Sequence, residues 1–322
     1  MEQTLRKIAA RIQQAKRVAI LTHMRPDGDA IGSALALSSA LEQLNIANQV
    51  CVETDIPSNL RFVKGVDAIV KKPQGEFDLW VALDCADEQR FGALTDVFMT
   101  AKRKNFDTVN IDHHISNTRY AKYNYVQKCA ANCMNVATLI EYLGASFDKK
   151  TAEYLLLGLM TDSGNFSHDD VTEECLLLAA KLVKAGANIC EFNYQLFKKQ
   201  PKQRAALFAH TMQRIRYYHD GRFAAIVITQ SATQEHGADV GMTEGFVDFP
   251  LNVDGVEVAA SLLEIRKGQY KVSLRSKSYA DVNRIAGTYG GGGHVRAAGC
   301  MLFGDIEEIF DKLCYTVSQY LE

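Results

Sequence analysis

The stretch RVAILTHMRPDGDAIGSALALSSALEQL, residues 17–44, decides how the N-terminal half of the chain folds. Its first part, residues 17–23, is a short apolar run rich in β-branched residues, which is typical of a buried parallel strand. From Ala30 to Leu44 the apolar residues recur with helical periodicity, and Gly32 with other small residues allows this helix to approach the sheet closely. The segment HMRPDGDA between them predicts a polar loop at the end of the strand.

Strand and helix patterns alternate along residues 1–190. Further strand candidates lie at residues 48–53, 78–84 and 107–112, and helical patterns at residues 135–144, 149–161 and 172–186. This order predicts an α/β fold with a doubly wound, mostly parallel sheet. Ligands of such sheets collect beyond the carboxyl ends of the strands.

Four short stretches place acidic and histidine side chains at the ends of these elements. They are HMRPDGDA (residues 23–30), LDCAD (83–87), IDHH (111–114) and MTDSG (160–164). Like charges at short range oppose ionisation, so many carboxylates share one site only when cations neutralise them. Mixed Asp and His side chains therefore predict a metal centre with more than one ion. The candidate residues are His23, Asp27, Asp29, Asp84, Asp112, His113, His114 and Asp162.

Several of these residues also have an ordinary structural interpretation. Asp29 could cap the helix that starts at Ala30, which is a common use of Asp. Asp84 could accept backbone hydrogen bonds from a neighbouring loop, and Asp162 could be a solvated residue at a helix end. Adjacent side chains diverge in direction, so we expect one histidine of the DHH sequence to bind an ion and the other to face the substrate.

The chain becomes polar and helical around residues 191–216, with Pro201 interrupting the pattern. We interpret residues 191–204 as a linker between a domain of residues 1–190 and a second domain of residues 205–322. The second domain has strand patterns at 222–230, 256–265, 269–276 and 297–303, and helical patterns at 281–289 and 305–321. This order predicts a smaller α/β domain with a mixed sheet.

The glycine run GGGGH, Gly290 to His294, allows backbone amides to converge on an anion without interference from a Cβ atom, and we expect a helix directly after it. Arg275 and Ser276 end a predicted strand, and Arg296 lies just beyond the glycines. Basic side chains beside a group of free amides predict a pocket for a terminal phosphate. A flexible loop is the alternative interpretation of the glycines.

Composition narrows the class of protein. With 322 residues, 47% of them hydrophobic, the chain exceeds what one core usually needs, and its net charge of −2 gives no broad basic field for long nucleic acid. The N-terminus has an amphipathic helical pattern rather than that of a signal peptide, and no window is long enough to span a membrane, so we expect a cytoplasmic protein.

The remaining cysteine and histidine residues give no clear site. The eight cysteines are scattered, and for the close pair Cys129 and Cys133 we favour buried free thiols in a reducing compartment over zinc ligands. Four histidines join no cluster that the sequence reveals, and we interpret them as surface or structural residues. They are His168, His210, His219 and His236.

Taken in order, the motifs HxxPDxDA, a strand-end Asp, DHH, TDSG and GGGGHxxAAG resemble those of the DHH phosphoesterase superfamily, and they extend over both predicted domains. Within it, the chain is similar to two-domain oligoribonucleases that also dephosphorylate 3′-phosphoadenosine 5′-phosphate (the NrnA type). The resemblance implies a hydrolase for short oligonucleotides and nucleoside bisphosphates, with its active site in a cleft between the domains. It also implies two divalent ions, Mn²⁺ before Mg²⁺ or Co²⁺.

The resemblance also implies a role for each matched residue. His23, Asp27 and Asp84 would hold one ion, and Asp29, Asp84, His113 and Asp162 would hold the other. His114 would contact the scissile phosphate, while Asp112 would orient its neighbours. The residues that would bind the nucleotide end of the substrate are Arg275, Ser276, Gly291, Gly292, Gly293 and His294. Arg90 would be a further substrate contact or else part of a surface ion pair.

Three other functions share part of this pattern. A phosphodiesterase for cyclic dinucleotides or for linear pApA and pGpG would use the same metal ligands. A DHH-type inorganic pyrophosphatase would carry a basic C-terminal segment in place of GGGGHxxAAG, and a non-catalytic nucleotide-binding regulator would lack a metal ligand. The sequence leaves open a homodimer and the choice among short RNA, bisphosphate and dinucleotide, and it predicts neither a long duplex nor a membrane as partner.

Overall fold

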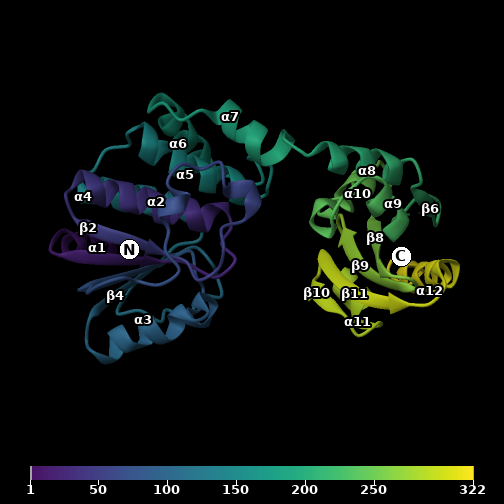
Figure 1. Ribbon diagram of the computed structural model, residues 1–322, viewed down its shortest axis with the longest axis horizontal. Coiled ribbons are helices and arrows are strands. Elements are labelled where there is room, and N and C mark those ends of the chain that lie inside the picture. The colour runs from purple at the N-terminus through teal and green to yellow at the C-terminus, as the bar shows by residue number, and fades with distance from the viewer. Residues whose placement is uncertain (1, 322) are drawn as a thin grey trace. The chain divides into compact units, whose positions relative to one another are not determined.

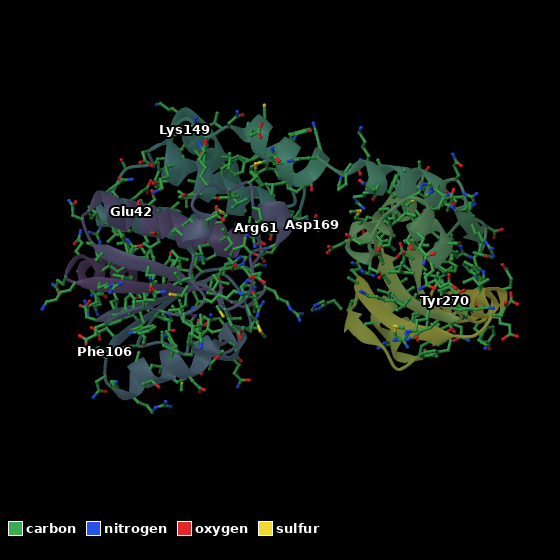
Figure 2. All side chains as sticks on the ribbon, viewed as in Figure 1. Glu42, Arg61, Phe106, Lys149, Asp169 and Tyr270 are labelled. Carbon is green, nitrogen blue, oxygen red and sulfur yellow. The ribbon has the colours of Figure 1, made fainter. Side chains whose placement is uncertain are left out.

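The computed structural model describes residues 2–321. Met1 and Glu322, which begin and end the two predicted domains, lie outside the described residues. The chain divides into two compact units, Met1–Lys199 and Gln200–Glu322. Each unit has its own sheet and its own cores, which the side chains of its strands and helices fill (Figures 1 and 2). The predicted α/β fold with a second, mixed sheet is confirmed.

The N-terminal unit is built on a parallel five-stranded sheet in the order β2-β1-β3-β4-β5. Its strands are β1 (Arg17–Leu21), β2 (Ala47–Cys51), β3 (Leu79–Leu83), β4 (Asp107–Asp112) and β5 (Tyr123–Val126). The chain passes from β1 to one neighbour, β2, and then returns to the other neighbour, β3. The loops after β1 and β3 therefore separate at a topological switch point, where ligands of open α/β sheets bind.

Helices cover both faces of this sheet (Figure 1). One face packs against α1 (Glu2–Gln13), α2 (Gly28–Gln43), α4 (Asn132–Leu143) and α5 (Lys149–Asp162), with α6 (Glu173–Lys184) beside α5. The other face packs against α3 (Leu94–Arg103). Successive side chains of a strand point to opposite faces, so that Val81 lies in the larger core while Trp80 and Ala82 lie in the core under α3.

The helix after β1 begins two residues earlier than its apolar pattern indicates. Asp27 is its N-cap, and the carboxylate accepts a hydrogen bond from the Ala30 amide at 3.0 Å.

The expected close approach of Gly32 to the sheet is wrong, because this glycine faces α5. A Cβ atom there would lie 2.5 Å from the Tyr154 carbonyl oxygen, so Gly32 allows α2 and α5 to pack backbone to backbone.

The six strands of the C-terminal unit follow the order β10-β11-β9-β8-β7-β6, with β7 and β8 parallel and the other pairs antiparallel. They are β6 (Arg216–Tyr218), β7 (Phe223–Ile228), β8 (Val258–Arg266), β9 (Gln269–Ser276), β10 (Gly292–His294) and β11 (Ala297–Phe303). One face packs on α11 (Val282–Gly287) and α12 (Ile306–Ser318). The other packs on α8 (Lys202–Met212), α9 (Gln230–Glu235) and α10 (Asp248–Leu251).

The segment before α8 differs from a simple linker. It contains α7 (Ile189–Asn193) and one π-helical turn, Tyr194–Lys198, and Pro201 is the N-cap of α8 rather than an interruption within a helix. Among residues 2–321, no helix is both long and apolar enough to cross a bilayer. All eight cysteines are free thiols.

Candidate metal centre

Asp84 lies one residue beyond β3, in an unusual local structure. Its φ angle is 52°, a left-handed conformation that non-glycine residues seldom adopt. The Asp84 amide donates to the Ile111 carbonyl oxygen of β4 at 3.0 Å, which holds this conformation in place. The side chain is 2% exposed, and its Oδ1 atom has no hydrogen-bond partner among the described residues. Backbone strain and an unpaired buried carboxylate both reduce stability, so this residue points to a functional role.

One group of potential ligands lies beside the Oδ2 atom of Asp84. The His23 Nε2 atom, in the loop after β1, is 3.9 Å from it and 3.9 Å from Asp27 Oδ2. Each of the three residues offers a donor atom within 4.8 Å of the other two. Asp27 thus caps α2 with one oxygen and faces His23 with the other.

A second group lies beside the Oδ1 atom of Asp84. The His113 Nε2 atom, just beyond β4, is 3.3 Å from this oxygen and 3.4 Å from Asp162 Oδ2 at the end of α5. Asp29 completes this group, with donor atoms of Asp29, His113 and Asp162 all within 4.8 Å of one another. The carboxylate of Asp84 therefore lies between the two groups of ligands.

The backbone fixes how the two histidines present their rings. The Nδ1 atom of His23 lies 3.0 Å from the Met24 carbonyl oxygen, and that of His113 lies 3.0 Å from the Cys129 carbonyl oxygen. A carbonyl only accepts, so each Nδ1 carries a proton, and Nε2 is the ring nitrogen that faces the carboxylates and is available to a cation. Metal-binding histidines are commonly oriented in this way.

Asp29 is held by the start of α4 rather than acting as a helix cap. Its Oδ2 accepts a hydrogen bond from the Asn132 amide, and its Oδ1 accepts one from the Cys133 amide at 2.9 Å. These amides belong to the first turn of a helix, where the helix dipole favours a negative charge. Gly158 of α5 leaves the necessary space, because a Cβ atom there would lie 2.5 Å from Asp29 Oδ1.

Asp112, His114 and Asn117 form a hydrogen-bonded chain at the edge of this cluster. Asp112 is fully buried, and its Oδ1 is 2.8 Å from His114 Nδ1. Its Oδ2 accepts a hydrogen bond from the Asn117 amide group at 2.6 Å. His114 is partly exposed, and its Nε2 is the ring nitrogen not used by Asp112.

The carboxylates of the cluster strongly perturb one another. Burial, together with the charges of Asp84 and Asp162, raises the pKa of Asp29 well above its ordinary value. Burial and the charge of Asp84 raise the pKa of Asp162 to about 6. Burial alone would lower the pKa of His113, but its contact with Asp84 and the charge of Asp29 raise it to about 10. A positive charge among these groups is therefore favourable.

These donor sets suit divalent cations. Imidazole nitrogens and carboxylate oxygens are ordinary ligands of such ions, and the unpaired Oδ1 of Asp84 is an oxygen that lacks any other partner in the described part of the chain. The fold brings together all eight residues that the four N-terminal motifs predict. We interpret the cluster as a metal centre at the switch point of the sheet.

The segment CAANC, residues 129–133, contributes its backbone instead of its thiols. The Cys129 carbonyl orients His113, and the Cys133 amide holds Asp29. Burial raises the pKa of the Cys129 thiol to about 12 and that of Cys133 well above its ordinary value, so both thiols are protonated at neutral pH. Sequence reasoning missed this role, and that of Asn117, because backbone groups and lone amides carry no motif signal.

Arg90 and the C-terminal candidates lie outside the cluster. Arg90 is exposed, and its carbonyl oxygen accepts a hydrogen bond from the Met24 amide at 2.7 Å, which connects its turn to the first motif. In the C-terminal unit, Arg275 Nε lies 3.8 Å from Asp248 Oδ1, and Ser276 is buried. His294 is exposed on β10.

The glycine run does not have the predicted structure. No helix follows it; instead, residues 292–294 form β10, which pairs with β11. A Cβ atom at Gly293 would lie 2.5 Å from the Ala297 carbonyl oxygen, so this glycine allows the two strands to approach. The Gly293 amide already donates to Asn283 Oδ1 at 2.8 Å, and the Arg296 guanidinium donates to the Ala280 carbonyl oxygen at 2.8 Å. Neither donor is thus free for a phosphate.

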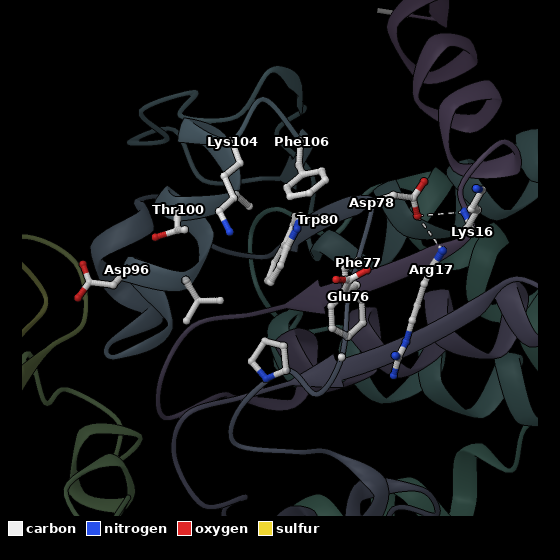
Figure 3. Close-up of a pocket in the computed structure, with 14 residues that line it drawn as sticks. Lys16, Arg17, Glu76, Phe77, Asp78, Trp80, Asp96, Thr100, Lys104 and Phe106 are labelled. Carbon is white, nitrogen blue, oxygen red and sulfur yellow. Dashed lines mark hydrogen bonds between the residues drawn. The ribbon is translucent and has the colours of Figure 1, made fainter.

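A cavity of about 740 Å³ lies elsewhere in the N-terminal unit (Figure 3). Trp80, Phe77 and Phe106 line it, beside Lys16 and Arg17. It adjoins the start of β3, whereas Asp84 follows the end of that strand, and none of the candidate metal ligands lines it. The cavity is therefore not part of the metal centre.

Comparison with known proteins places the chain in a family. Residues 17–159 match the DHH family, N-terminal domain, and residues 221–322 match the DHHA1 domain. The chain is 32% identical over 309 residues to the bifunctional oligoribonuclease and PAP phosphatase NrnA of Thermus thermophilus. The matched region covers 94% of this chain and 89% of that protein. It is 26% identical over 322 residues to a probable enzyme of the same name from Streptococcus mutans, covering 95% and 96%.

A solved structure gives the same result for the fold. The crystal structure of an exopolyphosphatase-related protein from Bacteroides fragilis superimposes with a TM-score of 0.85 at 24% identity, covering 99% of this chain and 97% of that one. The two matched domains and the 32% identical relative confirm the family resemblance inferred from the motifs. The chain belongs to the DHH family, with a DHH domain followed by a DHHA1 domain, and is a phosphoesterase, a hydrolase of phosphoester bonds.

Proposed function

We propose that this phosphoesterase hydrolyses short oligoribonucleotides to nucleoside monophosphates and 3′-phosphoadenosine 5′-phosphate to AMP, using two divalent cations. The observation that carries the proposal is the buried carboxylate of Asp84, which lies between two groups of potential metal ligands and has one unpaired oxygen. The substrate classes are those in the names of the Thermus thermophilus and Streptococcus mutans relatives. Eight free thiols fit the cytoplasm as its location.

We assign His23 and Asp27 to one cation and Asp29, His113 and Asp162 to the other, with Asp84 shared between them. A mixed set of imidazole and carboxylate ligands favours Mn²⁺ over Mg²⁺, which prefers oxygen ligands and retains its waters. Bound cations would lower the pKa of a water molecule and neutralise negative charge on the phosphate.

His114 is the side chain that would bind the scissile phosphate directly. The hydrogen bond to Asp112 raises the pKa of His114, so the imidazolium form is favoured. Asn117 in turn holds Asp112 at its other oxygen. The partly exposed His114 can therefore donate from Nε2 to a phosphate oxygen on which charge grows during the reaction, and its orientation is fixed beforehand.

Residues of the DHHA1 domain and one further arginine would bind the rest of the substrate. Arg275 and His294 offer a guanidinium and an imidazole to a phosphate or nucleotide end, and Arg90 offers a cation beside the first motif. Ser276 and the glycines at 291–293 would shape this region through packing, since Ser276 is buried and the glycines allow β10 to pair with β11.

Product analysis on labelled di- to heptaribonucleotides tests the proposal. Wild-type enzyme with Mn²⁺ should release mononucleotides from these substrates and phosphate from 3′-phosphoadenosine 5′-phosphate. A chelator should abolish both activities, and added Mn²⁺ should restore them. Parallel assays with pApA, pGpG, a cyclic dinucleotide and pyrophosphate complete the comparison. Turnover confined to the cyclic dinucleotide or pyrophosphate, or activity that persists in chelator, would contradict the proposal.

A further inference from the structure

A second cluster of potential metal ligands lies in the C-terminal unit and belongs to none of the sequence motifs. His210 is in α8, Glu235 is the last residue of α9, and His236 follows it. Each offers one donor atom, and these atoms all lie within 4.8 Å of one another. The two imidazole rings are 5.1 Å apart between centroids, at an interplanar angle of 67°.

The packing of α8 and α9 fixes the backbone of this cluster. Leu207 of α8 and Ala232 of α9 are buried in the same small core. His210 comes three residues after Leu207 on its helix, and the His236 amide donates to the Ala232 carbonyl oxygen at 3.1 Å. Both histidines are therefore held next to each other by buried neighbours, although neither is itself fully buried.

One atom of the cluster lacks the partner that its burial requires. The Nε2 atom of His236 is buried and has no hydrogen-bond partner within residues 2–321. Buried polar atoms are nearly always paired, so an unpaired ring nitrogen calls for an explanation. The Arg214 guanidinium donates to the His210 carbonyl oxygen at 2.8 Å and is not a partner of this ring nitrogen.

We propose that His210, Glu235 and His236 bind a Zn²⁺ ion that is separate from the catalytic cations. Two imidazoles and one carboxylate form a ligand set used for zinc, with water in the fourth position. Four of the six residues assigned to the catalytic centre are carboxylates, whereas two of the three ligands here are imidazoles, which favours zinc over Mn²⁺ or Mg²⁺. A bound ion would join α8 to α9 and so stabilise the C-terminal unit in proportion to its occupancy.

A zinc titration of the full-length chain tests this site. The Asp84→Asn background weakens binding at the catalytic centre, so that the second site can be followed by competition with a chromophoric chelator. We expect about one equivalent of Zn²⁺ to bind, and His210→Ala and Glu235→Gln each to weaken its affinity by about tenfold or more. Gln234→Ala changes an exposed neighbour in α9 and should leave the affinity unchanged.

Histidine side-chain NMR identifies the ligands directly and does not depend on activity. Zn²⁺ should shift the imidazole nitrogen signals of His210 and His236, assigned by substitution. Both test residues are at least partly exposed, so the variants should fold, which thermal unfolding without metal would verify. The proposal is overturned if Zn²⁺ shifts only the signals of His23, His113 and His114. It is also overturned if His210→Ala and Glu235→Gln bind Zn²⁺ as tightly as the parent.

Discussion

At the scale of single residues, Asp84 has a strained backbone and a buried, partly unpaired carboxylate, both unfavourable for folding, and a bound cation would offset them. Its carboxylate is buried beside other acids, and one oxygen is unpaired in the described residues. We predict that Asp84→Asn lowers Mn²⁺-dependent hydrolysis by about 100-fold or more, because a shared ligand is lost. The same change should raise the melting temperature of the metal-free chain, since a repelled buried charge is removed. Each 1 kcal/mol of stabilisation corresponds to about 2–4 °C.

The predicted fall in activity and rise in melting temperature distinguish a metal ligand from a residue that only supports the fold. If Asp84 were needed for the fold, the substitution would lower both activity and the melting temperature measured in chelator. Full activity of Asp84→Asn with Mn²⁺ would contradict the shared-ligand assignment.

The side chain of Asn117 is connected to the ring of His114 through Asp112. Its side-chain amide donates to Asp112 Oδ2 at 2.6 Å and to Asn110 Oδ1 at 2.9 Å. We predict that Asn117→Ala reduces kcat by about 10–100-fold, because Asp112 and the ring of His114 lose their fixed orientation. Mn²⁺ stoichiometry, measured by equilibrium dialysis, should stay the same. A loss of bound Mn²⁺ equal to that in Asp84→Asn would show that Asn117 supports the metal ligands instead.

Glu257 should determine part of the acid sensitivity of the C-terminal unit. It is 5% exposed, and its Oε1 accepts hydrogen bonds from the Tyr279 amide at 2.7 Å and the Ala280 amide at 2.9 Å. Burial alone would raise the pKa of Glu257, but hydrogen bonds from Ala280 and Ser278 lower it below its ordinary value. A lowered pKa stabilises the fold above the pKa of the unfolded chain, about 4.3, and this stabilisation is lost as pH falls through the folded pKa.

We therefore predict that Glu257→Gln destabilises the C-terminal unit by about 1–3 kcal/mol at pH 7, because an amide group replaces an acceptor of several N–H groups. The difference from wild type should shrink as pH falls below about 4. Urea unfolding at several pH values measures this, and a difference that is constant with pH would contradict the assigned role.

At the scale of elements, the sequence predicts best where burial is continuous. The run DTVNID is β4 at the predicted residues, and the other central strands differ from prediction by one or two residues at their ends. The edge strand β5 was missed because its four residues are all half-buried and form no apolar run. The short α9 and α10 were missed as well, since so few residues establish no periodicity.

The glycine run is needed for strand pairing, although the predicted helix after it is wrong. Gly293 has a φ angle of 155° and lies against the backbone of β11. We predict that Gly293→Ala destabilises the C-terminal unit by about 1–3 kcal/mol, through strain and displaced strand pairing. The matched control is Gly287→Ala in α11, where a Cβ atom would meet nothing within 4 Å and the change should be neutral or slightly stabilising.

Thermal unfolding of the two glycine variants compares them directly. Equal melting temperatures of the two variants would contradict close pairing of β10 with β11. They would instead support the alternative interpretation of the sequence, in which the glycines form a flexible loop.

At the scale of the whole molecule, the candidate metal centre could be predicted because parallel strands bring their carboxyl ends to one edge of a sheet. The α/β pattern therefore predicted that the ends of β1, β3 and β4 lie along one edge, and the observed order, with β3 between β1 and β4, makes them neighbours. The motifs named Asp29 and Asp162 as candidates, but the positions of these two residues depend on how α2, α4 and α5 pack, which the strand pattern alone does not determine. His210 and His236 could not be paired from sequence, because helix packing in the second unit brings them together.

The central claim is that these acidic side chains converge so closely that divalent cations must neutralise them. Anomalous diffraction at the manganese edge, from crystals of the full chain soaked in Mn²⁺, tests it most directly. We predict two peaks per chain, one beside His23 and Asp27 and one beside Asp29, His113 and Asp162, with Asp84 touching both. The absence of paired peaks at these residues, or two peaks that do not share Asp84, would contradict the account.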